Sequence, residues 1–106
     1  MKPDVSSIDL FTAREHLCRG EFTALELTDA CLHQIARLNP TINAFITPTP
    51  ASARQEALRA DALLPAHPSG KGRYALLGIP VALKDLFETA GIRTTAGSRF
   101  FADHLP

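Results

Sequence analysis

Apolar positions recur at helical spacing in the first part of the chain. We expect a first helix over about residues 8–19, with an apolar stripe made of Leu10, Ala13, Leu17 and Cys18. Ser7 is a suitable N-cap, because its hydroxyl can accept an amide hydrogen of the first turn. Gly20 follows the last apolar position and can take the left-handed conformation in which many helices end. The pattern therefore predicts a short amphipathic helix with a signal at each end.

A second helix is predicted over about residues 24–38. Thr23-Ala24-Leu25-Glu26 matches a capping box. In this motif the Thr23 hydroxyl accepts the backbone amide hydrogen of Glu26, and the Glu26 carboxylate accepts that of Thr23. The apolar stripe of this helix consists of Leu27, Ala30, Cys31, Ile35 and Leu38. We expect the helix to end at Asn39-Pro40, because a proline disfavours the helical conformation of the residue before it.

The next part of the chain predicts a short strand and then a third helix. Residues 41–47 alternate weakly between polar and apolar side chains, which favours a strand. Residues 51–64 are rich in Ala, Leu, Arg, Gln and Glu, all of which favour helices. Thr49-Pro50 before them suits an N-cap followed by a proline at the first helical position.

A second strand is predicted over about residues 76–84, and it ends in a lysine. Ile79, Val81 and Leu83 would share one face, and the other face is also apolar up to Lys84. Such a run indicates a strand covered on both sides. An ammonium delivered to the edge of a core is costly unless it is paired or loses its proton, and burial lowers the pKa of a lysine. Lys84 is therefore a candidate general base.

Composition and charge narrow the classes of function. The chain has 106 residues, enough for one small domain, and its 11 basic and 11 acidic side chains cancel. No basic stripe is present, so we expect no direct contact with nucleic acid. No apolar run follows the first residues, and no stretch approaches membrane-spanning length, so we expect neither a signal peptide nor a membrane partner.

The remaining reactive side chains add little. Cys18 and Cys31 lie inside helical patterns without metal-type spacing, so we expect two buried thiols in a cytoplasmic protein. The four histidines are scattered, and no metal or cofactor is expected. Ser98 follows Gly97 downstream of Lys84, and it either lines the same cavity or is a turn hydroxyl satisfied by the backbone.

Three stretches of the sequence carry a resemblance to a known family. Leu77-Gly78-Ile79-Pro80-Val81-Ala82-Leu83-Lys84-Asp85, followed by Thr89-Ala90-Gly91-Ile92-Arg93-Thr94-Thr95-Ala96-Gly97-Ser98, resembles the catalytic-lysine segment of the amidase signature family. Leu38-Asn39-Pro40-Thr41-Ile42-Asn43-Ala44-Phe45 and Phe22-Thr23-Ala24-Leu25-Glu26-Leu27-Thr28 also resemble the corresponding passages of that family. The resemblance therefore covers nearly all of the chain.

The resemblance implies a fold and a reaction. The fold would be α/β, with helices flanking a mixed β-sheet. Members of the family hydrolyse or transfer amides with a Ser–cis-Ser–Lys triad, so the substrate would be a small-molecule amide and no cofactor is implied. Lys84 would be the base, which takes a proton through the bridging serine while the nucleophilic serine forms an acyl-enzyme. The substrate-binding residues stay unknown.

The chain also departs from the family pattern. The Gly- and Ser-rich signature that brings both catalytic serines lies downstream of the lysine segment in family members, which are several times longer. Residues 1–106 are therefore expected to be a partial, amino-terminal amidase domain that is inactive alone. Because covering elements would be absent, we expect exposed apolar surface around Ile79, Val81 and Leu83, and a risk of self-association.

Two other interpretations stay open. The resemblance also fits the amidase-like subunit of an aspartyl/glutamyl-tRNA amidotransferase, which would release ammonia from glutamine and need partner subunits and ATP. A homodimer is a further possibility for a partner. The third interpretation, from a different class, is a non-catalytic product, either truncated or serving as a helical interaction module.

Overall fold

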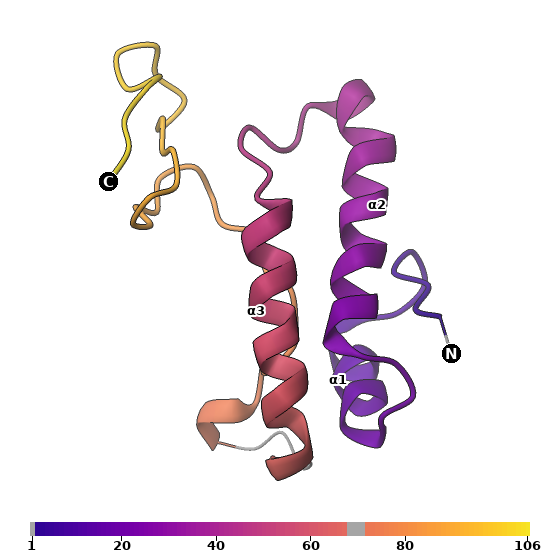
Figure 1. The fold of residues 1–106 in the computed structure, drawn as a ribbon. Helices are drawn as coiled ribbons and strands as arrows, with labels where there is room; N and C mark the ends of the chain where they lie inside the picture. The colour runs from indigo at the N-terminus through magenta and orange to yellow at the C-terminus, as the bar shows by residue number, and fades with distance from the viewer. Residues whose placement is uncertain (1, 68–71) are drawn as a thin grey trace.

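The computed structural model describes residues 2–67 and 72–106. Three α-helices come first, and two 3₁₀ turns follow: α1 (Leu10–Arg19), α2 (Ala24–Ile42), α3 (Pro50–Leu63), η1 (Leu64–Ala66) and η2 (Gly72–Tyr74). The helices α2 and α3 run antiparallel side by side, and α1 lies near the start of α2 (Figure 1). The residues after η2 return along α3 and continue beyond its first turn (Figure 1). Within the described residues, no helix is both long and apolar enough to cross a membrane.

The structure confirms the predicted C-cap of α1 and corrects the predicted N-cap. Gly20 has φ of 70° and donates its amide hydrogen to the carbonyls of His16 and Leu17, as a left-handed C-cap does. The N-cap is Asp9 rather than Ser7, because the Asp9 carboxylate accepts the Thr12 amide hydrogen at 2.8 Å. Ser7 belongs instead to a preceding turn. The helix therefore begins slightly later than the predicted position.

The start of α2 is capped from two directions. The predicted capping box is confirmed: the Glu26 amide donates to Thr23 Oγ1 at 3.0 Å, and the Thr23 amide donates to Glu26 Oε1 at 3.2 Å. In addition, the Asp61 carboxylate of α3 accepts the amide hydrogens of Ala24 at 2.6 Å and Leu25 at 3.1 Å. Side-chain oxygens thus satisfy amides that a helix start leaves without partners.

The end of α2 was predicted wrongly. The helix continues through Pro40 to Ile42 and ends at Asn43, which has φ of 50° and donates to the Asn39 carbonyl at 2.8 Å. Proline removes only one ladder hydrogen bond so close to the end of a helix. The Asn39 side chain also donates to the Phe45 carbonyl at 3.0 Å and accepts the Phe45 amide hydrogen at 2.8 Å. These contacts hold the chain after Pro40 against the last turn.

The third helix agrees closely with the prediction. It covers Pro50–Leu63, with Thr49 at the N-cap and Pro50 in the first turn. The Thr49 side chain makes no capping hydrogen bond, so the fixed φ of Pro50 is the stronger local signal.

The core is small and lies where α1, the start of α2 and α3 meet. Its buried apolar residues are Ala13, Leu17, Phe22, Ala24, Leu27, Ala57 and Ala60. The radius of gyration is 15.1 Å, against about 13 Å for a compact domain of this length. The accessible surface is 7464 Å², against about 5,800 Å² for a folded monomer of 11.5 kDa. Much apolar surface is therefore left uncovered.

Neither predicted strand is formed in the part of the chain that the structure describes. Residues 41–47 finish α2 and then turn, and residues 76–84 lack regular pairing. The single sheet-type pairing among the described residues is an isolated antiparallel bridge between Thr89 and Ile92. A strand needs a neighbour for its backbone hydrogen bonds, and no described segment lies beside these runs as one. Three helices are therefore present as expected, with shifted ends in α1 and α2, but the mixed sheet is not present in the described residues.

Residues 76–84 are also not covered on both sides. Leu77 and Ile79 pack against the core, and Gly78 between them approaches α1 and α2 so closely that a Cβ would lie 3.1 Å from that of Ala24. Beyond this anchor, Val81 is 80% exposed and Leu83 is 60% exposed. The expectation of exposed apolar surface is thus confirmed at Val81 and Leu83 and wrong at Ile79.

Candidate functional site

Lys84 lies at the end of the extended run and at the start of a turn. Its carbonyl accepts the amide hydrogens of Leu86 at 2.7 Å and Phe87 at 3.1 Å, which reverses the chain directly after it. The lysine is exposed instead of lying at the edge of a core. Among the described residues, the ion pairs involve other side chains, so the Lys84 ammonium has no carboxylate partner there.

The neighbouring Asp85 carboxylate is fully occupied elsewhere. Its Oδ1 accepts the Thr95 amide hydrogen at 2.7 Å, and its Oδ2 accepts the Thr95 hydroxyl hydrogen and, at 3.4 Å, the Gly97 amide hydrogen. The Thr95 Oγ1 in turn accepts from the Gly97 amide at 3.2 Å. Asp85 therefore points its carboxylate at the turn around Ala96, and it forms no ion pair with Lys84.

The turn Thr95–Ser98, which is hydrogen-bonded to Asp85, has two residues with positive φ. Ala96 has φ of 52° and Gly97 has φ of 67°, and the Ser98 amide donates to the Thr95 carbonyl at 2.9 Å. Two successive left-handed residues closed by this hydrogen bond form a type I′ turn. Ser98 Oγ accepts the Phe100 amide hydrogen at 3.1 Å, which supports the interpretation of Ser98 as a turn hydroxyl. No hydrogen bond joins Ser98 to Lys84 among the residues that are described.

Polar groups form the interior of the segment after Lys84. Thr94 and Thr95 are each 5% exposed, whereas Phe87 is 62% and Phe100 is 87% exposed. The Thr94 hydroxyl donates to the Ile92 carbonyl at 3.1 Å. In this segment hydrogen bonds, and not apolar packing, fix the chain.

The last residues of the chain fold back onto this loop. The Thr94 amide donates to the His104 carbonyl at 3.0 Å, and Arg93 Nε donates to the Ala102 carbonyl. His104 Nε2 lies 2.9 Å from Glu88 Oε1. These contacts close residues 85–106 into one hydrogen-bonded unit.

The contacts of Asp85 explain why its pKa is lowered. The hydrogen bond from the Thr95 hydroxyl lowers the pKa of Asp85 most, followed by the bond from the Thr95 amide. The Gly97 amide and the positive charge of Arg93 lower it further, and partial burial opposes them. Donors that bind the charged form favour ionisation, so Asp85 is a carboxylate at neutral pH.

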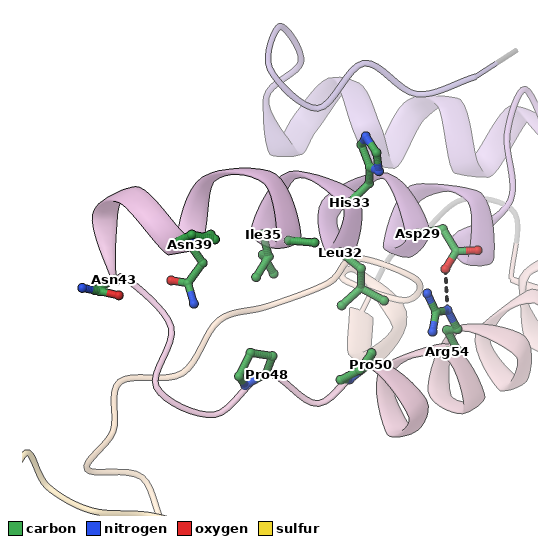
Figure 2. Close-up of a pocket in the computed structure, with 11 residues that line it drawn as sticks. Asp29, Leu32, His33, Ile35, Asn39, Asn43, Pro48, Pro50 and Arg54 are labelled. Carbon is green, nitrogen blue, oxygen red and sulfur yellow. Dashed lines mark hydrogen bonds and ion pairs between the residues drawn. The ribbon is translucent and has the colours of Figure 1, made fainter.

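A separate groove lies between α2 and the start of α3. Its volume is about 750 Å³, and Figure 2 shows the side chains that line it. The lining residues are Asp29, Leu32, His33, Ile35, Ala36, Asn39, Pro40, Asn43, Pro48, Pro50 and Arg54. None of them belongs to the segment of Lys84, so this groove and the candidate catalytic residue are different parts of the molecule.

The groove offers little chemistry. Arg54 Nε lies 2.7 Å from Asp29 Oδ1, and both side chains are about half exposed (Figure 2). The side-chain amide of Asn39 is already hydrogen-bonded to the backbone of Phe45. Sequence reasoning missed the groove, because its lining comes from two helices and carries no recognisable spacing.

Two histidines outside these regions have structural partners, whereas the two cysteines are unpaired. His16 pairs with Glu21, and the His67 ring stacks on Tyr74 with centroids 3.7 Å apart. Cys18 and Cys31 are free thiols and only partly buried, which corrects the expectation of buried thiols. Burial raises the pKa of Cys31.

Comparisons with known proteins agree with the resemblance of the lysine segment. The family model described as Amidase matches residues 26–106, a range that contains Lys84 and Asp85. A glutamyl-tRNA(Gln) amidotransferase subunit from Granulibacter bethesdensis is 47% identical over 102 residues, which are 96% of this chain and 20% of that protein.

Two further relatives carry the same name. The protein from a Roseiflexus species is 42% identical over 99 residues, or 93% of this chain, and that from Nitrobacter winogradskyi is 44% identical over 103 residues, or 97%. The chain spans 20% of the length of each of these relatives. Because the family model matches most of the chain, this protein belongs to the amidase family.

Proposed function

We propose that this chain is the amino-terminal part of an enzyme that hydrolyses or transfers amides, with Lys84 as its catalytic base. The observation that carries the proposal is the position of Lys84 inside the region matched by the amidase model, together with the Asp85 carboxylate turned away from it. A general base must be free to accept a proton, and the Asp85 carboxylate, which binds Thr95 and Gly97, does not hold the Lys84 side chain in an ion pair.

The remainder of such an enzyme would supply the missing parts of the site. We propose that two serines, one of them following a cis peptide bond, come from residues outside this chain. Val81 and Leu83 are exposed beside Lys84, so a covering segment would remove water from the amine. Loss of water disfavours the ammonium form, and the neutral amine could then activate a serine. The isolated chain is proposed to be inactive, because the nucleophile and the oxyanion hole would come from those other residues.

A second candidate is the amidase-like subunit of a tRNA-dependent amidotransferase. The names of the relatives favour this candidate over a free-standing amidase. The substrate amide would then be that of glutamine, and the released ammonia would pass to a partner protein of the same complex. A requirement for partner proteins and ATP would distinguish this candidate from an amidase that works alone.

The test uses the longest natural product of the gene. Its hydrolysis of glutamine and of simple amides is measured for the parent, for Lys84→Ala and for Lys2→Ala, which removes an exposed lysine outside the matched region. Lys84→Ala should lower kcat by about a factor of 10²–10⁴, as expected when a general base is lost. Lys2→Ala should retain the parent rate, and circular dichroism should be unchanged for both.

The outcomes separate the candidate functions. Ordinary turnover in Lys84→Ala would contradict the catalytic assignment. Absence of amide chemistry in the parent, with or without partner proteins and ATP, would instead favour a non-catalytic product.

A further inference from the structure

We infer that Asp85 is a positioning residue, which holds the turn Thr95–Ser98 against the segment of Lys84 and so sets the place of both relative to the substrate amide. The inference rests on the proposed amide chemistry at Lys84. Asp85 itself would touch neither the substrate nor the serines. Its action would pass through the backbone of the turn and through the peptide that it shares with Lys84.

The first support is the number and kind of contacts that one carboxylate makes. Both oxygens of Asp85 accept hydrogen bonds from the turn, with the Thr95 amide at 2.7 Å and the Gly97 amide at 3.4 Å, and with the Thr95 hydroxyl completing the set. Hydrogen bonds to a charged acceptor are stronger and more directional than those between neutral groups. One side chain therefore joins two segments that lie 10 to 12 residues apart.

The second support is the backbone strain at Ala96. Its φ of 52° lies in the left-handed region, where the Cβ of an alanine crowds the following carbonyl oxygen. Such a conformation persists when its surroundings hold it in place. Asp85 binds Thr95 on one side of Ala96 and Gly97 on the other, so the carboxylate holds the strained residue from both sides.

The third support is that the Asp85 carboxylate binds the turn and forms no ion pair with Lys84. A carboxylate next to a lysine in sequence is an obvious ion-pair partner, yet the donors of Thr95 and Gly97 occupy its oxygens. The Lys84 carbonyl is meanwhile held by the amides of Leu86 and Phe87. The Lys84 carbonyl and the Asp85 side chain are thus both fixed, and the Lys84 side chain is not drawn into an ion pair with Asp85.

The fourth support is that apolar side chains of the described residues do little to order the turn. The buried side chains of this segment are threonines, and its aromatic rings are exposed. Apolar packing therefore contributes little to the turn within the described residues, so its conformation depends on hydrogen bonds. Thr94 and Thr95 offer a matched pair, because both are 5% exposed and only Thr95 contacts Asp85.

The experiment compares the kcat and KM of three threonine variants, made in the longest natural product of the gene. The rates are expressed per folded molecule. Thr95→Val removes the hydroxyl that binds Asp85 at nearly constant volume, Thr95→Ser keeps it, and Thr94→Val removes a hydroxyl that binds only backbone carbonyls. A displacement of about 1 Å can cost on the order of 100-fold in rate, so Thr95→Val should lower kcat by about 10- to 100-fold. KM should change little, and Thr95→Ser and Thr94→Val should stay within about threefold of the parent.

A second measurement follows the turn itself. Amide hydrogen exchange of residues 95–98 should quicken in Thr95→Val, whereas exchange within α2 should not change. Equal losses of kcat in Thr94→Val and Thr95→Val would overturn the inference, because they would indicate general loosening of the loop. Parent turnover in Thr95→Val, with Lys84→Ala inactive, would also overturn it while leaving the proposed function intact. Parent turnover in Lys84→Ala would overturn both.

Discussion

Asp61, near the end of α3, accepts the backbone amide hydrogen of Ala24 at 2.6 Å and so caps the first turn of α2 from the opposite helix. A helix start carries unpaired amides and a partial positive charge, and a carboxylate satisfies both. The same carboxylate accepts from Leu25 at 3.1 Å. This contact fixes how the two long helices align, because it joins one end of α3 to one point on α2.

Replacement of Asp61 should therefore destabilise the helical hairpin. Asp61→Ala removes two hydrogen bonds to a charged acceptor and should lower the free energy of unfolding by about 2–4 kcal/mol, measured by urea denaturation. Asp29→Ala is the control, since it removes a carboxylate of α2 whose ion pair with Arg54 is about half exposed. Such pairs contribute about 0–1 kcal/mol. Equal losses in the two variants would contradict the role of Asp61.

Gly78 should tolerate no side chain. Its φ is 83°, and a Cβ would approach Ala24 to 3.1 Å and Leu17 to 3.3 Å. Gly20 is the control, because its φ is 70° but a Cβ there would meet nothing within 4 Å. Gly20→Ala should cost about 1–2 kcal/mol from backbone strain alone. Gly78→Ala should cost about 1–3 kcal/mol more from overpacking, again by urea denaturation. Similar costs would show that the segment of Gly78 can move away from the helices.

These contacts show what local pattern can and cannot predict. The capping box of Thr23 and Glu26 and the left-handed Gly20 depend on neighbours within a few residues, so the sequence predicted them correctly. The Asp61 cap joins residues 37 apart in the chain, and no spacing reveals it. Pro40 was overestimated as a helix end, since the Asn39 side chain binds the Phe45 backbone and so holds the chain against the last turn.

The candidate site was predicted in the same uneven way. The position of Lys84 at the end of an apolar run could be found from the sequence, and the family match contains it. Its surroundings could not, because a strand pairs only with a partner and none is present in the described chain. The grip of Asp85 on Thr95 was also missed, since a turn ten residues away can be recognised only once the chain has folded.

The turn held by Asp85 should weaken in acid. Hydrogen bonds lower the pKa of Asp85 in the folded loop below the ordinary value of about 3.9. The stabilisation is therefore present above the ordinary value and is lost as the pH falls through the lowered one. The amide chemical shifts of Thr95 and Gly97 should report this transition by nuclear magnetic resonance. Asp85→Asn should abolish it, and a Thr95 transition that persists in this variant would assign the titration to another group.

The exposed apolar side chains should drive self-association of the isolated chain. Val81 is 80% exposed and Phe100 is 87% exposed, and the accessible surface exceeds that of an ordinary monomer of this mass. Light scattering should show association that grows with concentration. The double variant Val81→Lys/Phe100→Lys should reduce it, whereas Leu58→Lys, which changes an exposed leucine on α3, should not. A parent chain that stays monomeric would contradict this prediction.

The small side chains of the core have a thermal consequence. Among the residues that the structure describes, four of the seven buried apolar ones are alanines, which lets the helices approach closely but buries little hydrocarbon. The heat capacity of unfolding follows the apolar area that becomes hydrated, so it should fall below the roughly 1.2–1.5 kcal/mol/K of a typical domain of about 100 residues. Calorimetry of this chain should consequently record a low, wide peak, and cooling should weaken the fold only slightly.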